Sequence, residues 1–156
     1  AGGWRTSDAL QQDIAAFATA GDTVVEFGSG TGTKDLVDLE LNVFSVEHNA
    51  YWVDFGRKAG IGSDYQHAPI VPLPEKINGF PKQLDWYDVD AVEAVCERAV
   101  ATSREGHVDH VLVDGPPGEI GRAGVLYSIK HGHLDVSNAV IFIDDIHVSF
   151  MFHIIV

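Results

Sequence analysis

The fold of this chain is decided by residues 23–33, which read TVVEFGSGTGT. The first five of these residues are mostly β-branched or aromatic, as in a short buried strand. They run directly into a turn with glycines at alternate positions, Gly28, Gly30 and Gly32. Glycine permits a tight turn with positive φ and lets a ligand lie against bare backbone. A helix is predicted over 34–39, and its N-terminus would favour an electron-rich ligand at the same place.

The rest of the chain alternates between strand and helix patterns. Strands are predicted at 42–47, 65–71, 110–114 and 139–145. Helices are predicted at 9–20, after an N-cap at Ser7 or Asp8, and at 49–59, 88–102, with Asp88 as the cap, and 122–131. Strands that alternate with helices imply parallel pairing with right-handed crossovers. We therefore expect an α/β fold: a Rossmann-like, doubly wound, mostly parallel sheet with helices on both faces.

Acidic residues follow the predicted strands at the points where the strands end. Glu26, Glu47, Asp114 and Asp144 all lie at or just past a strand C-terminus. In open α/β sheets, ligands bind at that edge, near the reversal of strand order. A carboxylate at Glu47 could accept hydrogen bonds from both hydroxyls of a ribose.

The spacing of the glycines bears on the class of cofactor. Dinucleotide-binding folds use G-x-G-x-x-G, whereas the turn that begins at Gly28 reads G-x-G-x-G. Glu26 stands two positions before the first glycine, where its charge would repel a pyrophosphate and attract an ammonium group. The pattern favours S-adenosylmethionine. An NAD-binding oxidoreductase or sugar-nucleotide enzyme, and a non-catalytic cofactor-binding module, stay open as alternatives.

Four segments carry a resemblance to a known family. Residues 26–32 resemble the first motif of class I S-adenosylmethionine-dependent methyltransferases, and residues 43–47 resemble the second. Residues 111–118 are similar to the motif of the family's fourth strand, and residues 141–145 to that of its fifth. The four matches occur in the family's order and cover most of the chain.

The resemblance implies a cofactor site and a reaction. Gly28, Gly30 and Gly32 would lie beneath the methionine portion of the cofactor, with Ser29 beside them. Glu26 would lie near the ammonium group, Glu47 on the ribose hydroxyls, and His48 next to Glu47. The implied activity is methyl transfer to a small-molecule or sugar acceptor, with O-methylation favoured because the Asn-Pro-Pro-Tyr signature of many amino-group methyltransferases is absent.

Asp114 and Asp144 are the candidate catalytic residues. In this family Asp114 would be close to the transferred methyl, although Asp-Gly-Pro-Pro is also a turn signal. Asp114, Asp144 and Asp145 could together bind a divalent cation such as Mg²⁺, or could be carboxylates oriented by backbone N–H groups alone. A short match to plant glucuronoxylan-type methyltransferases implies Arg122 as the partner of an acidic sugar, the alternative being an ordinary surface arginine.

Composition limits the remaining possibilities. The 156 residues suit one domain, and the net charge of −13 argues against nucleic acid as a partner. No apolar run is long enough to span a bilayer. The lone Cys96, expected to be buried on a helix, excludes an intrachain disulfide and is consistent with a cytoplasmic location. The oligomeric state is open.

The C-terminal end differs from the family pattern. The family adds a helix and an antiparallel hairpin after the fifth strand, and only 11 residues follow Asp145 here. We therefore expect the single methyltransferase domain over 1–156 to be incomplete, with the last antiparallel hairpin missing.

Overall fold

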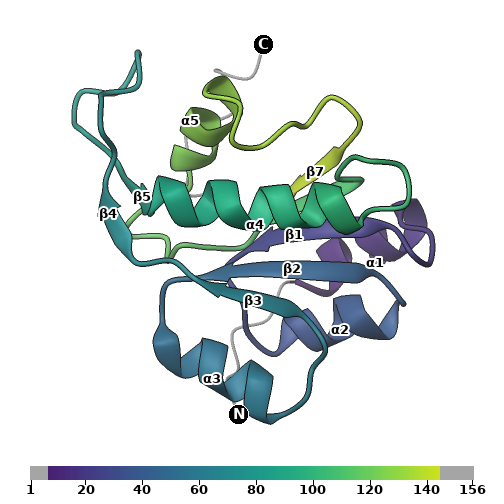
Figure 1. Ribbon diagram of the computed structural model, residues 1–156. Coiled ribbons are helices and arrows are strands. Elements are labelled where there is room, and N and C mark those ends of the chain that lie inside the picture. The colour runs from purple at the N-terminus through teal and green to yellow at the C-terminus, as the bar shows by residue number, and fades with distance from the viewer. Residues whose placement is uncertain (1–6, 145–156) are drawn as a thin grey trace.

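The computed structural model of the protein describes residues 7–144 (Figure 1). The strands are β1 (Thr23–Phe27), β2 (Asn42–Glu47), β3 (Asp64–His67), β4 (Ile70–Pro72), β5 (Asp85–Tyr87), β6 (His110–Val113) and β7 (Val140–Ile143). The helices are α1 (Asp8–Phe17), α2 (Gly32–Asp38), α3 (Ala50–Lys58), α4 (Val89–Thr102) and α5 (Gly124–Lys130). Within residues 7–144, no helix is long and apolar enough to cross a membrane.

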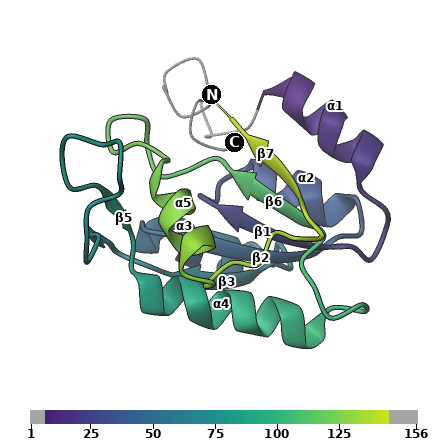
Figure 2. The ribbon, with the colours of Figure 1, turned by 90° about the horizontal axis from the view of Figure 1, so that it is seen from above.

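Five strands form one sheet in the order β3-β2-β1-β6-β7, and every pair in it is parallel. Along the chain, the sheet starts at its centre with β1 and extends outward through β2 to β3. It then continues on the other side of β1 with β6 and β7. The strand order therefore reverses between β1 and β6, as Figure 2 shows from above. This Rossmann-like topology confirms the predicted α/β fold.

Helices cover both faces of the sheet. In Figure 1, α2 and α3 lie below the strands and α4 and α5 lie above them. The alternation of side chains along β1 supplies both faces. Val24 packs in one core with Ile14 of α1 and Leu36 of α2, whereas Val25 and Phe27 belong to the larger core on the other face.

The strand predicted over 65–71 is wrong in its extent, because the structure divides it into β3 and β4. The parallel ladder ends where the Ala68 N–H donates to the carbonyl oxygen of Glu47 (2.8 Å). Pro69 follows and has no N–H to continue a ladder. After it, β4 pairs with β5 in a separate antiparallel ribbon, with residues 73–84 as the connection between them.

The ends of the helices follow from local hydrogen bonds. Ser7 and Asp88 are the N-caps of α1 and α4, as predicted, and each accepts a backbone N–H in the first turn (3.3 and 3.1 Å). Helix α1 ends at Phe17 instead of Ala20. It stops early because the Thr19 N–H donates to the Asp22 carboxylate (2.9 Å), which closes a turn before β1.

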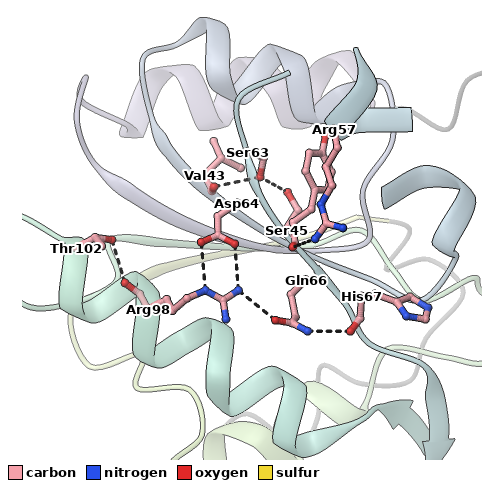
Figure 3. Close-up of polar contacts among 10 residues, drawn as sticks. Val43, Ser45, Arg57, Ser63, Asp64, Gln66, His67, Arg98 and Thr102 are labelled. Atoms are coloured by element: carbon pink, nitrogen blue, oxygen red, sulfur yellow. Dashed lines mark hydrogen bonds and ion pairs between the residues drawn. The ribbon is translucent and has the colours of Figure 1, made fainter. Parts of the chain in front are cut away.

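A polar contact ties α4 to the edge strand β3 (Figure 3). The guanidinium of Arg98 donates to both carboxylate oxygens of Asp64, at 3.2 and 3.0 Å, and to Gln66 at 3.2 Å. Such a bidentate pair fixes direction as well as distance. It therefore sets the position of α4 along the sheet edge, and β5 enters α4 directly through Asp88.

Candidate functional site

A cleft of about 440 Å³ lies at the carboxyl ends of β1, β2, β6 and β7. This is the edge where the strand order reverses, the usual ligand site of such sheets. Its lining residues are Ser7, Gly28, Ser29, Glu47, His48, Asn49, Trp52, Tyr87, Asp114, Gly115, Pro116, Pro117, Gly118, Arg122 and Asp144.

The glycine turn after β1 forms part of the cleft wall. Gly28 has φ +89°, and its N–H donates to the carbonyl oxygen of Val46 (2.8 Å), which extends the pairing of β1 with β2. A Cβ atom on Gly28 would lie 2.8 Å from the backbone nitrogen of Gly115. The turns that follow β1 and β6 are therefore in direct backbone contact, and neither position has room for a side chain.

Glu26 lies beneath this turn and not in the cleft. Its side chain is on the α2 face of β1, only 2% exposed, and accepts a hydrogen bond from the Thr33 hydroxyl. Thr33 Oγ1 in turn accepts the Gly30 N–H (3.2 Å). Glu26 and Thr33 thus hold the glycine turn from below.

Burial controls the charge of Glu26. Loss of solvation raises its pKa to about 8, and the nearby carboxylates of Asp114 and Glu47 act in the same direction. Hydrogen bonds from Thr33 and Ser45 oppose the shift but are outweighed. At neutral pH the Glu26 carboxyl is therefore mostly protonated, so it adds little negative charge to the cleft.

Glu47 is oriented by the backbone on both sides. One carboxylate oxygen accepts the Ser29 N–H (2.9 Å) and the Ser29 hydroxyl (3.3 Å), and the other accepts the Asn49 N–H (2.6 Å). The side chain is 4% exposed and lines the cleft. A carboxylate has about four acceptor positions, so Glu47 keeps one for a ligand's hydroxyl group, and a second becomes available if the ligand displaces the Ser29 hydroxyl.

Two further residues extend the cleft along the start of α3. His48 Nδ1 lies 3.1 Å from Glu47 Oε2, in a geometry that gives no hydrogen bond. Trp52, which is not among the predicted site residues, also lines the cleft. It contacts the rings of Tyr51 and Phe55 edge-on, with centroids 5.3 and 5.5 Å apart. The part of the cleft that Glu47 and His48 line is therefore flanked by an aromatic ring.

Arg122 joins the two strand ends on the other side of the cleft. Arg122 is 7% exposed, and its guanidinium donates to the backbone carbonyl oxygens of Asp114 (2.8 Å), Pro116 (3.3 Å) and Asp144. The expectation of an ordinary surface arginine is wrong, because the side chain is buried and donates to three carbonyl groups beyond β6 and β7. Contacts with the backbone occupy much of the guanidinium that the resemblance assigns to an acidic sugar.

Tyr87 is a cleft residue that sequence reasoning missed. Its ring packs against Phe27 and Trp86, with centroids 5.8 and 5.0 Å away, and its side chain is fully buried. The hydroxyl has no hydrogen-bond partner among the described residues. The available signal was the run Asp85-Trp86-Tyr87-Asp88, a short aromatic strand that ends at a helix cap.

The structure brings together six of the nine predicted site residues. Gly28, Ser29, Glu47, His48, Asp114 and Asp144 all line the one cleft. Glu26, Gly30 and Gly32 do not line it, and their direct contact with a cofactor stays a prediction.

The predicted metal site at the strand ends stays untested, because Asp145 lies outside the described residues. Within residues 7–144, one group of three possible metal ligands has its ligand atoms within 4.8 Å of one another: Glu105, His107 and Asp109. That group precedes β6, at the opposite end of the strand from Asp114.

Comparisons with protein-family models, curated proteins and solved structures found no match for this chain. The fold and the site thus define a protein with a Rossmann-like sheet and a cleft at its switch point. That arrangement is compatible with binding a nucleotide cofactor.

Proposed function

We propose that this chain is an S-adenosylmethionine-dependent methyltransferase domain that binds its cofactor in the cleft between β1 and β6. One observation carries the proposal: a glycine turn in the cleft wall is flanked by the carboxylates of Glu47 and Asp114, and Asp144 is a third. No lysine lines the cleft within the described part of the chain, and the guanidinium of Arg122 donates to backbone carbonyls.

Charge separates this cofactor from a dinucleotide. A pyrophosphate carries two negative charges and would lie close to these carboxylates, which is unfavourable in a partly desolvated cleft. S-adenosylmethionine has a positive sulfonium and an ammonium group, which the same carboxylates attract. The distinction rests on Glu47, Asp114 and Asp144, because Glu26 is buried and mostly protonated.

The proposed contacts follow from the groups already oriented in the cleft. Glu47, held by the N–H groups of Ser29 and Asn49, would accept the ribose hydroxyls. Gly28 and Ser29 would contact the methionine portion, and His48 and Trp52 the adenosine. The net charge of −13 further favours a small-molecule or sugar acceptor over nucleic acid.

The bound cofactor supplies an electrophilic methyl group, so the chain's own task is to position an acceptor and to take up its proton. Asp114 and Asp144, at the ends of neighbouring strands, are the proposed proton acceptors for a hydroxyl nucleophile. A divalent cation held by the same carboxylates would be an alternative way to activate that hydroxyl.

Calorimetric titration tests the cofactor. We expect S-adenosylmethionine and S-adenosylhomocysteine to bind and NAD not to bind. Glu47→Gln should lower the affinity for both adenosyl ligands by about tenfold or more, because a charge-assisted hydrogen bond is lost. Glu97→Gln, the same change on the exposed face of α4, is the control and should leave both affinities unchanged.

Other outcomes of the titration favour the alternatives. Binding of NAD alone would replace the proposal with an oxidoreductase or sugar-nucleotide enzyme. If the adenosyl ligands bind, transfer of a labelled methyl group to hydroxyl-bearing sugars and phenols separates an enzyme from a non-catalytic cofactor-binding module. At saturating cofactor, where any loss of cofactor affinity is compensated, such transfer should still fall in Asp114→Asn.

A further inference from the structure

The hydroxyl of Tyr87 is a buried polar group with no assigned task. The side chain is fully buried and lines the cleft, and its hydroxyl has no hydrogen-bond partner among the described residues. A buried hydroxyl without a partner is unfavourable and rare in folded proteins. The energy lost in the free protein is recovered when a ligand supplies the missing partner.

The position of this hydroxyl is fixed by its surroundings. Phe27 and Trp86 pack against the ring, and a Cβ atom on Gly115 would lie 2.5 Å from Tyr87 Oη. The same Cβ atom would lie 2.8 Å from the Cα of Gly28. The hydroxyl therefore lies beside the contact between the two glycine turns, on the side of the cleft where the amino-acid part of the cofactor is expected.

Burial and the nearby charges determine the protonation state of the Tyr87 hydroxyl. Loss of solvation raises the pKa of Tyr87 well above its usual value, and the nearby Glu47 carboxylate raises it further, against the opposing effect of Arg122. The hydroxyl therefore keeps its proton at any physiological pH and can donate it. The α-carboxylate of an adenosylated amino acid would face repulsion from Glu47 and Asp114, and a hydroxyl that keeps its proton offsets that repulsion by donating a hydrogen bond to it.

We propose that the Tyr87 hydroxyl donates a hydrogen bond to the α-carboxylate of the bound S-adenosylmethionine and so selects a cofactor with an intact amino-acid group. This inference rests on the proposed function. Tyr87 acts here as a ligand-binding residue that takes no part in the transfer itself. Its contribution should be absent for ligands that have the adenosine and the thioether but no carboxylate.

The test compares wild type with Tyr87→Phe in calorimetric titrations with S-adenosylhomocysteine and with 5′-methylthioadenosine, which lacks the amino-acid group. We expect Tyr87→Phe to lower the affinity for S-adenosylhomocysteine by about tenfold or more, because a hydrogen bond to a charged group is lost. The affinity for 5′-methylthioadenosine should change by less than about twofold. Tyr51→Phe, which removes a hydroxyl from a residue 64% exposed on α3, is the matched control and should leave both affinities as in wild type.

A thermal unfolding scan of the ligand-free proteins checks that the variant folds. Phenylalanine keeps the ring and removes only the unpartnered hydroxyl, so the midpoint of Tyr87→Phe should equal or exceed that of wild type. A midpoint well below wild type would mean that the hydroxyl already has a structural partner, and would overturn the inference.

The remaining outcomes separate this inference from the proposed function. Equal affinity of wild type and Tyr87→Phe for S-adenosylhomocysteine would overturn the role of Tyr87 and leave the cofactor proposal standing. Equal weakening of both ligands would place the hydroxyl on the adenosine side and overturn the carboxylate contact. Failure of wild-type protein to bind either ligand would overturn both proposals.

Discussion

Gly28 and Gly115, which are 87 positions apart in the chain, meet backbone to backbone at the point where the sheet reverses its strand order. A Cβ atom on either residue would come within 2.8 Å of a backbone atom of the other. Gly28 also has φ +89°, a conformation that side chains rarely adopt. This contact fixes the distance between the turns after β1 and β6, and with it the width of the cleft.

Alanine at either glycine should therefore separate the two turns. We expect Gly28→Ala and Gly115→Ala each to lower the free energy of unfolding by at least about 2 kcal/mol. Both variants overpack the contact between the turns, and Gly28→Ala adds backbone strain. Binding of S-adenosylhomocysteine should weaken by about tenfold or more. Denaturant titration and calorimetry measure the two effects.

Gly118→Ala is the matched control for these variants. Gly118 lines the same cleft, but a Cβ atom on it would have no neighbour within 4 Å. Its effect on the free energy of unfolding should stay within about 0.5 kcal/mol. If Gly28→Ala were as stable as Gly118→Ala, the close approach of the two turns would not hold in solution.

Glu26 should make the free energy of unfolding decrease as the pH rises from 4.5 to about 8. The pKa of this buried carboxyl is about 8 in the folded chain, against an ordinary value of 4.5. Between these two pH values the folded chain holds a proton that the unfolded chain has released. The stabilisation is complete below pH 4.5 and is lost as the pH rises through 8.

Glu26→Gln, which cannot ionise, should remove this dependence. From pH 6 to pH 8 the free energy of unfolding of wild type should fall by about 2–3 kcal/mol relative to the variant. Denaturant titrations at several pH values measure the difference, with Glu97→Gln on the exposed face of α4 as the control. Parallel pH profiles for wild type and Glu26→Gln would show that Glu26 is ionised when buried.

The fold was predictable because local signals and the global arrangement agree in this chain. The predicted bounds of β1 and β2 match those in the structure, since each strand is bounded by a glycine or by a capped helix. Alternation of strands and helices then implied the parallel sheet. The division of β3 from β4 was not predicted, because the sequence of 65–71 does not show that the residues before and after Pro69 pair with different strands.

The candidate site was predictable where it depends on strand ends, and not where it depends on packing. Glu47 and Asp114 follow strands, so topology alone brings them to one edge. Glu26 also ends a strand, yet the alternation of side chains directs it to the α2 face, where Thr33 meets it. Tyr87 and Arg122 reach the cleft through contacts with Phe27 and with backbone carbonyls, which no spacing rule in the sequence expresses.

Arg122 should be sensitive even to a conservative change. Its planar guanidinium donates to three carbonyl oxygens at once, those of Asp114, Pro116 and Asp144, and a lysine ammonium cannot match that geometry. Arg122→Lys should lower the free energy of unfolding by about 2–3 kcal/mol, because buried carbonyl groups lose their donors. Affinity for S-adenosylhomocysteine should fall as well.

Arg104→Lys is the control for that substitution, since the Arg104 side chain is 64% exposed and donates to the carbonyl oxygen of Ala20. Its effect should be within about 0.5 kcal/mol. Wild-type stability and affinity in Arg122→Lys would mean that the ends of β6 and β7 hold their positions without the guanidinium.

Cys96 offers a measure of how rigidly α4 covers the sheet. Burial, with smaller contributions from Glu93 and Glu97, raises the pKa of its thiol to about 12, against an ordinary value of 9.0. A thiol reagent at pH 8 should therefore react with the native protein at least about 100-fold more slowly than with the urea-unfolded chain, because only the thiolate reacts. Cys96→Ala, which should show no labelling, is the control.

If native Cys96 reacts only after global unfolding, the destabilised variant Gly115→Ala should speed the reaction by about tenfold for each 1.4 kcal/mol of lost stability. Rapid labelling of the wild type would instead show that α4 opens independently of the sheet.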